Sequence, residues 1–166
     1  AGAAKVSGRL GAWSVGLLEA ATLEEEGRYL TSDGVRGSAV VEPFTNHLVG
    51  RARRDFREGN STLGGIFTAV NRDLSTAALD EALHSAAYVA GLDVNHMWKN
   101  REWFVTGTIT GSRVEGSQEA ILLTQRSSAR YFQRPDVGHT ELDPTRTSLN
   151  GWRGTFSAGR RGGDHW

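Results

Sequence analysis

Apolar and polar residues alternate along most of the chain. In residues 101–113, for example, Val105 and Ile109 alternate with Thr106 and Thr108. A period of two places successive side chains on opposite faces of a β-strand. The pattern predicts seven strands, at 4–10, from 13 to about 24, 44–56, 62–69, 88–95, 101–113 and 147–158, and an eighth that starts at 165–166.

The segments between the predicted strands alternate between short and long. Short turns are expected at 11–12, 57–60, 99–100 and 160–163, and long loops at 24–42, 71–84 and 114–145. Within the long loops, residues 77–83 and 119–123 have the composition of short helices. Outer-membrane β-barrels have short periplasmic turns and long extracellular loops. The alternation therefore favours such a barrel over a Greek-key sandwich.

Large aromatic residues gather near the ends of the predicted strands. Six are expected at the short-turn ends, namely Trp13, Phe56, Trp98, Trp103, Phe156 and Trp166, and a weaker group near the long loops is Tyr29, Phe44 and Tyr88. Two aromatic girdles border the apolar band of a membrane barrel. The aromatic positions thus support the same interpretation as the loop lengths.

The alternation assigns each predicted strand residue to one of two faces. The lipid-facing side is predicted to carry Val6, Gly8, Leu10, Trp13, Val15, Leu17, Leu63, Phe67, Leu92, Val94, Val105 and Ile109. The opposite, lumen-facing side is predicted to carry Lys5, Arg9, Arg51, Arg53, Asp55, Asp93 and Asn95. Charged residues on that side can stabilise the sheet by pairing across strands, or they can select a solute. Stabilisation of the sheet is the favoured role.

The composition of the chain argues against several classes of protein and site. The length of 166 residues suits one domain. The 19 basic and 19 acidic residues are interspersed along the chain, so the sequence does not indicate a basic surface that would bind nucleic acid. The absence of cysteine excludes disulfides and thiolate metal sites. No apolar run approaches the ~18–20 residues of a membrane-spanning helix, whereas a tilted strand needs only ~9–11. The start shows no signal peptide, so we expect residues 1–166 to be a fragment of a larger exported barrel.

No motif indicates catalysis or a cofactor. The five histidines, His47, His84, His96, His139 and His165, form no HExxH pattern. Residues 139–143 offer a histidine and two carboxylates that could ligate a hard cation, although a solvated loop is the favoured reading. Ser127 and Ser128 do not lie in a GxSxG-type motif, which surrounds the nucleophilic serine of many hydrolases. Gly64 and Gly65 lie inside a predicted strand, where packing explains them. We therefore expect neither enzymatic activity nor a cofactor.

Five segments resemble the DUF5916 family. They are Gly8–Leu18 (GRLGAWSVGLL), Glu42–Asn46 (EPFTN), Arg53–Phe56 (RRDF), Gly111–Ser117 (GSRVEGS) and Gln125–Asp136 (QRSSARYFQRPD). This is a family of unknown function whose large bacterial members look like outer-membrane barrels. A domain similar to family 9 carbohydrate-binding modules commonly precedes the barrel. The resemblance implies fold and location, and it provides no functional residues to carry over.

The sequence thus predicts an all-β, antiparallel up-and-down meander that forms part of a transmembrane β-barrel in the bacterial outer membrane. Its expected partners are membrane lipid and a carbohydrate or other small solute, and its expected role is transport or the display of a carbohydrate-binding domain. A soluble β-sandwich that serves as a binding module is the alternative. A glycan-acting enzyme has least support, because no pair of carboxylates can be placed.

Overall fold

The computed structural model describes residues 1–136 and 141–161, which fold as an all-β meander with two short helices and one 3₁₀ turn. The strands are β1 (Gly2–Leu10), β2 (Trp13–Thr22), β3 (Glu25–Leu30), β4 (Arg36–Glu42), β5 (Phe44–Phe56), β6 (Ser61–Asp73), β7 (Ala86–Trp98), β8 (Trp103–Glu115) and β9 (Ser148–Arg160). The helical elements are η1 (Arg57–Gly59), α1 (Ala77–Ala82) and α2 (Gln118–Arg126).

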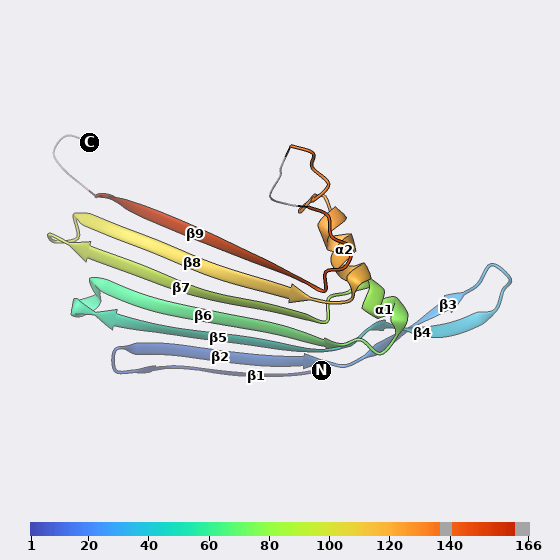
Figure 1. The fold of residues 1–166 in the computed structure, drawn as a ribbon. Coiled ribbons are helices and arrows are strands. Elements are labelled where there is room, and N and C mark those ends of the chain that lie inside the picture. Colours follow the sequence, from blue (N-terminus) through green and yellow to red (C-terminus); the bar gives the residue numbers. More distant parts are fainter. Residues whose placement is uncertain (137–140, 162–166) are drawn as a thin grey trace.

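Seven strands form one antiparallel sheet in the order β1-β2-β5-β6-β7-β8-β9. Each strand pairs with its neighbour in that order, so the predicted meander is confirmed. The short turns lie at one end of the sheet, and the long connections with α1 and α2 lie at the other (Figure 1). Within the described residues β1 and β9 pair on one side only. The sheet is therefore open, with edge backbone groups available for pairing.

The first long connection contains a hairpin that the polar composition of residues 24–42 did not predict. Strands β3 and β4 pair with each other as a separate two-stranded sheet. This hairpin projects beyond the end of the large sheet and lies over neither of its faces (Figure 1). A Cβ atom on Gly37 would lie 2.6 Å from the Tyr29 ring, and one on Gly27 would lie 2.7 Å from Val41. Side chains packed on glycines thus hold the hairpin together.

Both predicted helices are present in the other two long connections. Thr76 caps α1 by accepting a hydrogen bond from the Leu79 amide, and Ser117 caps α2 by accepting one from the Ala120 amide. Such caps satisfy amides that have no partner inside the helix. The Ser117 hydroxyl also donates to the Asp80 carbonyl at 2.6 Å, and thereby joins the two helices. Within the described part of the chain, no helix is long and apolar enough to cross a membrane.

The register of the large sheet places all twelve residues of the predicted lipid-facing side on one face. Val6 lies opposite Leu17, Leu63 opposite Val94, and Leu92 opposite Ile109. We call this side the apolar face. Its two central rows contain no polar side chain on any of the seven strands: Val6, Leu17, Gly50, Phe67, Ala90, Gly111 and Trp152, then Gly8, Val15, Ala52, Gly65, Leu92, Ile109 and Gly154.

The apolar face is open to solvent rather than buried. Leu92 is 59% exposed and Ile109 is 56% exposed, although both lie on central strands. By contrast, Ile121 and Gln125 of α2 are fully buried. Among the described residues, buried apolar side chains are few, and the two larger ones, Leu79 and Ile121, belong to α1 and α2. A soluble sheet would bury its apolar side first, so this arrangement is the reverse of a globular core.

Aromatic residues border the apolar face at the short-turn end. Trp98 stacks on Trp103 with ring centroids 6.3 Å apart, and the Arg54 guanidinium lies over both Trp13 and Phe56. Phe156 lies in the same row as Trp13, on the short-turn side of the two central rows. One predicted position is wrong, because Tyr29 lies on the projecting hairpin. Phe44 and Tyr88 lie on the apolar face, while Trp166 and the predicted eighth strand lie outside the described residues.

We expect residues 1–166, expressed alone, to require detergent for monodispersity. Their apolar face exceeds the few hundred Å² of contiguous apolar surface that soluble monomers expose. Size-exclusion chromatography with light scattering, in buffer with and without detergent, measures this. A monodisperse monomer in plain buffer would contradict the expectation, because the apolar face would then have to be covered.

Candidate functional site

The other side of the large sheet, which we call the polar face, is the candidate site. The register brings all seven predicted lumen-facing residues to this face, on three strands: Lys5, Arg9, Arg51, Arg53, Asp55, Asp93 and Asn95. Arg9 and Arg53 share one row, since both lie opposite Ser14 of β2. The common face of these residues is confirmed, and their exposure to a lumen remains a prediction.

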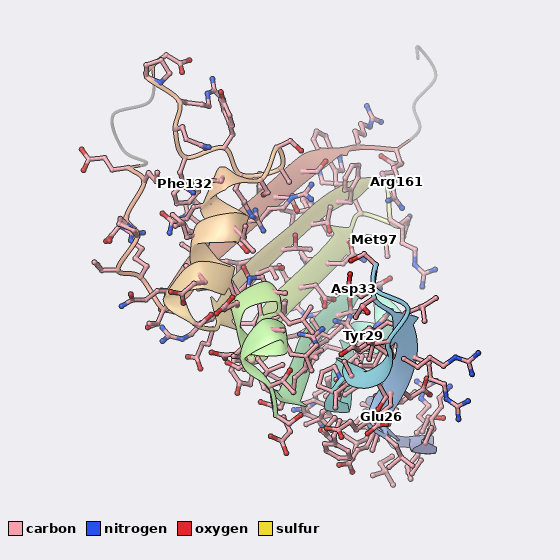
Figure 2. All side chains as sticks on the ribbon, turned by 90° about the vertical axis from the view of Figure 1, so that its right-hand side faces the viewer. Glu26, Tyr29, Asp33, Met97, Phe132 and Arg161 are labelled. Atoms are coloured by element: carbon pink, nitrogen blue, oxygen red, sulfur yellow. The ribbon has the colours of Figure 1, made fainter. Side chains whose placement is uncertain are left out.

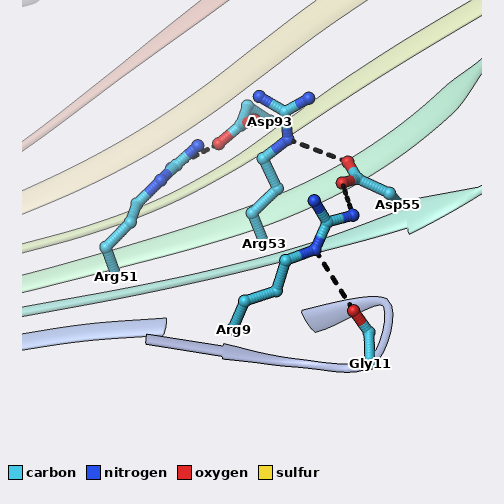
Figure 3. A network of polar contacts seen from close by, with 6 residues as sticks. All are labelled: Arg9, Gly11, Arg51, Arg53, Asp55 and Asp93. Atoms are coloured by element: carbon cyan, nitrogen blue, oxygen red, sulfur yellow. Dashed lines mark hydrogen bonds and ion pairs between the residues drawn. The ribbon is translucent and has the colours of Figure 1, made fainter. Parts of the chain in front are cut away.

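Two ion-pair groups form on the polar face (Figure 3). Asp55 accepts from two arginines, with Arg9 Nη2 at 3.4 Å and Arg53 Nε at 3.3 Å. Arg51 Nη1 lies 2.5 Å from Asp93 Oδ1. These contacts join β1 to β5 and β5 to β7, across strands that are not neighbours in the sheet. These ion pairs therefore connect non-neighbouring strands on the polar face of the sheet. For Lys5 and Asn95 the described residues provide no side-chain partner of this kind.

A glycine makes room for the Arg51–Asp93 ion pair. Strand β6 runs between β5 and β7, and Gly64 lies opposite both Arg53 and Asp93. A Cβ atom at Gly64 would lie 2.6 Å from Asp93 Oδ1 and 2.7 Å from Arg51 Nη2. The ion pair thus passes directly over Gly64. Its neighbour Gly65 faces the apolar side, where a Cβ would make an ordinary contact at 3.5 Å.

The predicted set of polar-face residues missed two arginines, Arg72 of β6 and Arg153 of β9. Arg153 lies opposite Thr110 of β8, in the same row as Arg51. With these two, the strands of the polar face carry six basic residues (Lys5, Arg9, Arg51, Arg53, Arg72 and Arg153) and two acidic ones (Asp55 and Asp93). The face is therefore strongly positive, although the whole chain has no net charge.

The helical connections contact the polar face at its long-loop end. The Arg72 guanidinium donates to the His84 carbonyl at 3.0 Å, just beyond α1. A cavity of about 280 Å³ lies between the α2 connection and the sheet. Thr124 and Phe132 line it from the connection, and Val114 and Leu149 line it from the polar face. Viewed from this end, the helices and Phe132 lie on the β8–β9 side of the sheet, and the hairpin projects toward the viewer in front of the β2–β5 side (Figure 2).

Two further contacts hold these connections in place. His84 Nε2 lies 2.7 Å from Thr124 Oγ1, which itself donates to the Ala120 carbonyl at 3.1 Å. The hydroxyl proton of Thr124 is thus engaged, so His84 Nε2 is the donor in this bond. Gln125 forms a two-bond clasp with the Asp143 backbone, at 2.8 Å and 2.9 Å. The first contact links the second and third long connections to each other, and the second joins two parts of the third connection.

The environment of His84 opposes its protonation. Burial, followed by the positive charge of Arg72, lowers the pKa of His84 below its ordinary value of 6.5. The neutral imidazole is therefore the form that the docked connections favour. The alternation of the strands did not identify His84 as a site residue, because His84 lies in a loop and its partner Thr124 is 40 residues away in the sequence.

The candidate cation site at 139–143 finds no support. His139 and Thr140 lie outside the described residues. The Asp143 carboxylate accepts from the Thr145 amide and hydroxyl and pairs with Arg146, and these contacts, the Thr145 hydroxyl first, lower the pKa of Asp143. No group of three or more histidine, aspartate or glutamate side chains positioned for a metal is found in residues 1–136 and 141–161.

No family model matches the chain, and neither a curated protein nor a solved structure matches it. The functional interpretation therefore depends on the geometry of the chain itself.

The ion pair over Gly64 gives a testable prediction. In a double-mutant cycle with Arg51→Gln and Asp93→Asn, we expect a coupling free energy of ~0.2–1 kcal/mol, the range for partly exposed pairs. Gly64→Ala should abolish the coupling by separating the two side chains, whereas Gly65→Ala should retain it. The measurement is urea unfolding of the full-length protein in lipid vesicles. Equal coupling in both alanine variants would show that the pair does not cross Gly64.

The lowered pKa of His84 predicts acid release of the helical connections. When they undock, His84 binds a proton more readily, so docking has its full stability above pH 6.5 and loses part of it as the pH falls through the lowered pKa. Amide exchange over Gln118–Arg126 should therefore be faster at about pH 5 than at about pH 7.5, after correction for intrinsic rates. His84→Gln should remove this difference and the control His96→Gln should keep it. A difference that persists in His84→Gln would exclude His84 as the cause.

Proposed function

We propose that this chain is a wall segment of a bacterial outer-membrane β-barrel, with its apolar face in lipid and its polar face toward the lumen. One observation carries the proposal. The two central rows of the apolar face contain no polar side chain on seven neighbouring strands, yet the side chains there are exposed. Lipid is the environment in which such a surface is stable.

The placement of the helices supports the same proposal. In a soluble β-sandwich, covering elements pack on the apolar side of a sheet. Here the connections with α1 and α2 contact the polar face, and the β3–β4 hairpin lies beyond the end of the sheet. Long connections that fold toward the lumen are compatible with a barrel. This arrangement disfavours the soluble binding module, which remains the alternative.

The height of the apolar face also suits a membrane. Asn150 and Arg160 mark its two rims on β9, and at ~3.3 Å per residue they lie ~33 Å apart along the strand. A strand tilt of ~40° reduces this to a height of ~25 Å, the height of the apolar band of outer-membrane barrels. The stacked Trp98 and Trp103 lie at the short-turn rim, where an aromatic girdle is expected.

Closure of the barrel requires further strands. The single-sided edges β1 and β9 would each pair with another strand, because no open edge is stable in the hydrocarbon region. The short turns would face the periplasm and the long connections the exterior. Membership of the DUF5916 family is part of this proposal and rests on the sequence motifs alone. The proposed roles are passage of a small solute or carbohydrate, or display of a carbohydrate-binding domain.

Arginine substitutions on opposite faces of β8 test the proposal. Val105→Arg places a charge on the apolar face and should destabilise the inserted protein by roughly 2–4 kcal/mol near the bilayer midplane. Thr106→Arg places the same charge on the polar face and should cost far less. The free energy of unfolding in phospholipid vesicles measures both. Equal costs would contradict the proposed lipid contact, as would recovery of the wild-type protein in the soluble fraction of cells.

A further inference from the structure

Four arginines form a band across the polar face. Arg9 and Arg53 share one row of the sheet, and Arg51 and Arg153 share the next row. These rows lie directly behind the two charge-free rows of the apolar face. In the proposed barrel, the arginine band is therefore at about the mid-depth of the membrane.

The carboxylates beside the arginine band do not neutralise it. Asp55 is shared by two arginines and Asp93 pairs with one. For Arg153 no ion pair is found within the described residues, and its side chain is exposed. The guanidinium groups are accessible as well, since the side chains of Arg9, Arg51 and Arg53 are 66%, 40% and 50% exposed.

Small and hydroxylic residues surround the arginine band. Gly16 leaves its row open on β2, whereas the Arg51–Asp93 ion pair covers Gly64 and the side chains of Thr110 and Ile66 crowd Gly91. Thr108 and Thr155 follow on β8 and β9. The hydroxyls of these two threonines lie 2.5 Å apart. The polar face thus presents neutral hydroxyl donors beside the charged guanidinium donors. Connections α1 and α2 contact the polar face at a different level, near its long-loop end.

We propose that the arginine band lines a pathway for small anions. This inference rests on the proposed barrel and adds the class of solute. A band with more guanidinium groups than carboxylates attracts anions and repels cations, and low-dielectric walls strengthen that field. Guanidinium groups also present paired donors that match carboxylate and phosphate oxygens. Water and the neighbouring hydroxyls complete the solvation of a passing ion.

Zero-current potentials in a KCl gradient test the inference, with the full-length protein in planar lipid bilayers. The wild-type protein should prefer chloride to potassium severalfold. Arg53→Gln combined with Arg153→Gln should reduce this preference toward unity. The matched control is Arg54→Gln, which removes a neighbouring arginine from the apolar face and should leave the preference unchanged. Asp93→Asn should raise the preference, a change that misfolding would not produce.

Each other outcome overturns a defined part of the account. Heat-modifiable gel mobility and outer-membrane fractionation first establish that each variant is an inserted barrel. An inserted barrel that does not conduct, that prefers potassium, or that responds equally to the double substitution and to Arg54→Gln overturns the anion pathway and leaves the barrel standing. Failure of the wild-type protein to insert overturns the proposed function, and the inference with it.

Discussion

The alternation of side chains across the pleat is the constraint on which the rest of this structure depends. Because the period is two, a slip of one residue in any strand would exchange its apolar and polar side chains. The register of the large sheet avoids such a slip on all seven strands. Both the charge-free rows and the arginine band follow from that one alignment. Short turns at 11–12, 57–60 and 99–102 fix it locally, and the Arg51–Asp93 bridge fixes it across β6.

Much of the fold could be predicted because alternation is a local signal. It placed β5 with its observed bounds and assigned both faces without error for every named residue. It missed the β3–β4 hairpin, because pairs such as Tyr29 over Gly37 stabilise that hairpin without a buried face. It also ended the last strand at residue 158, two residues before β9 ends.

The candidate site was only partly predictable, for a physical reason. A strand pattern gives the face of Arg51 and Asp93, but contact between them depends on the absence of a side chain at Gly64. The His84–Thr124 contact joins two loops whose relative positions no local pattern encodes. Together these features describe a sheet with one exposed apolar face, one cationic face and docked loops at one end. That combination is consistent with a barrel that admits small anions.

The central claim is that one face of each strand meets lipid and the other meets water. The chain contains no cysteine, so single cysteines at residues 104–111 can carry spin labels. In the full-length protein in lipid vesicles, labels at Val105, Gly107 and Ile109 should collide with oxygen dissolved in the membrane. Labels at Thr106, Thr108 and Thr110 should collide instead with a water-soluble nickel complex. Collision rates without a period of two, or protection of the odd-numbered positions from both reagents, would contradict the account.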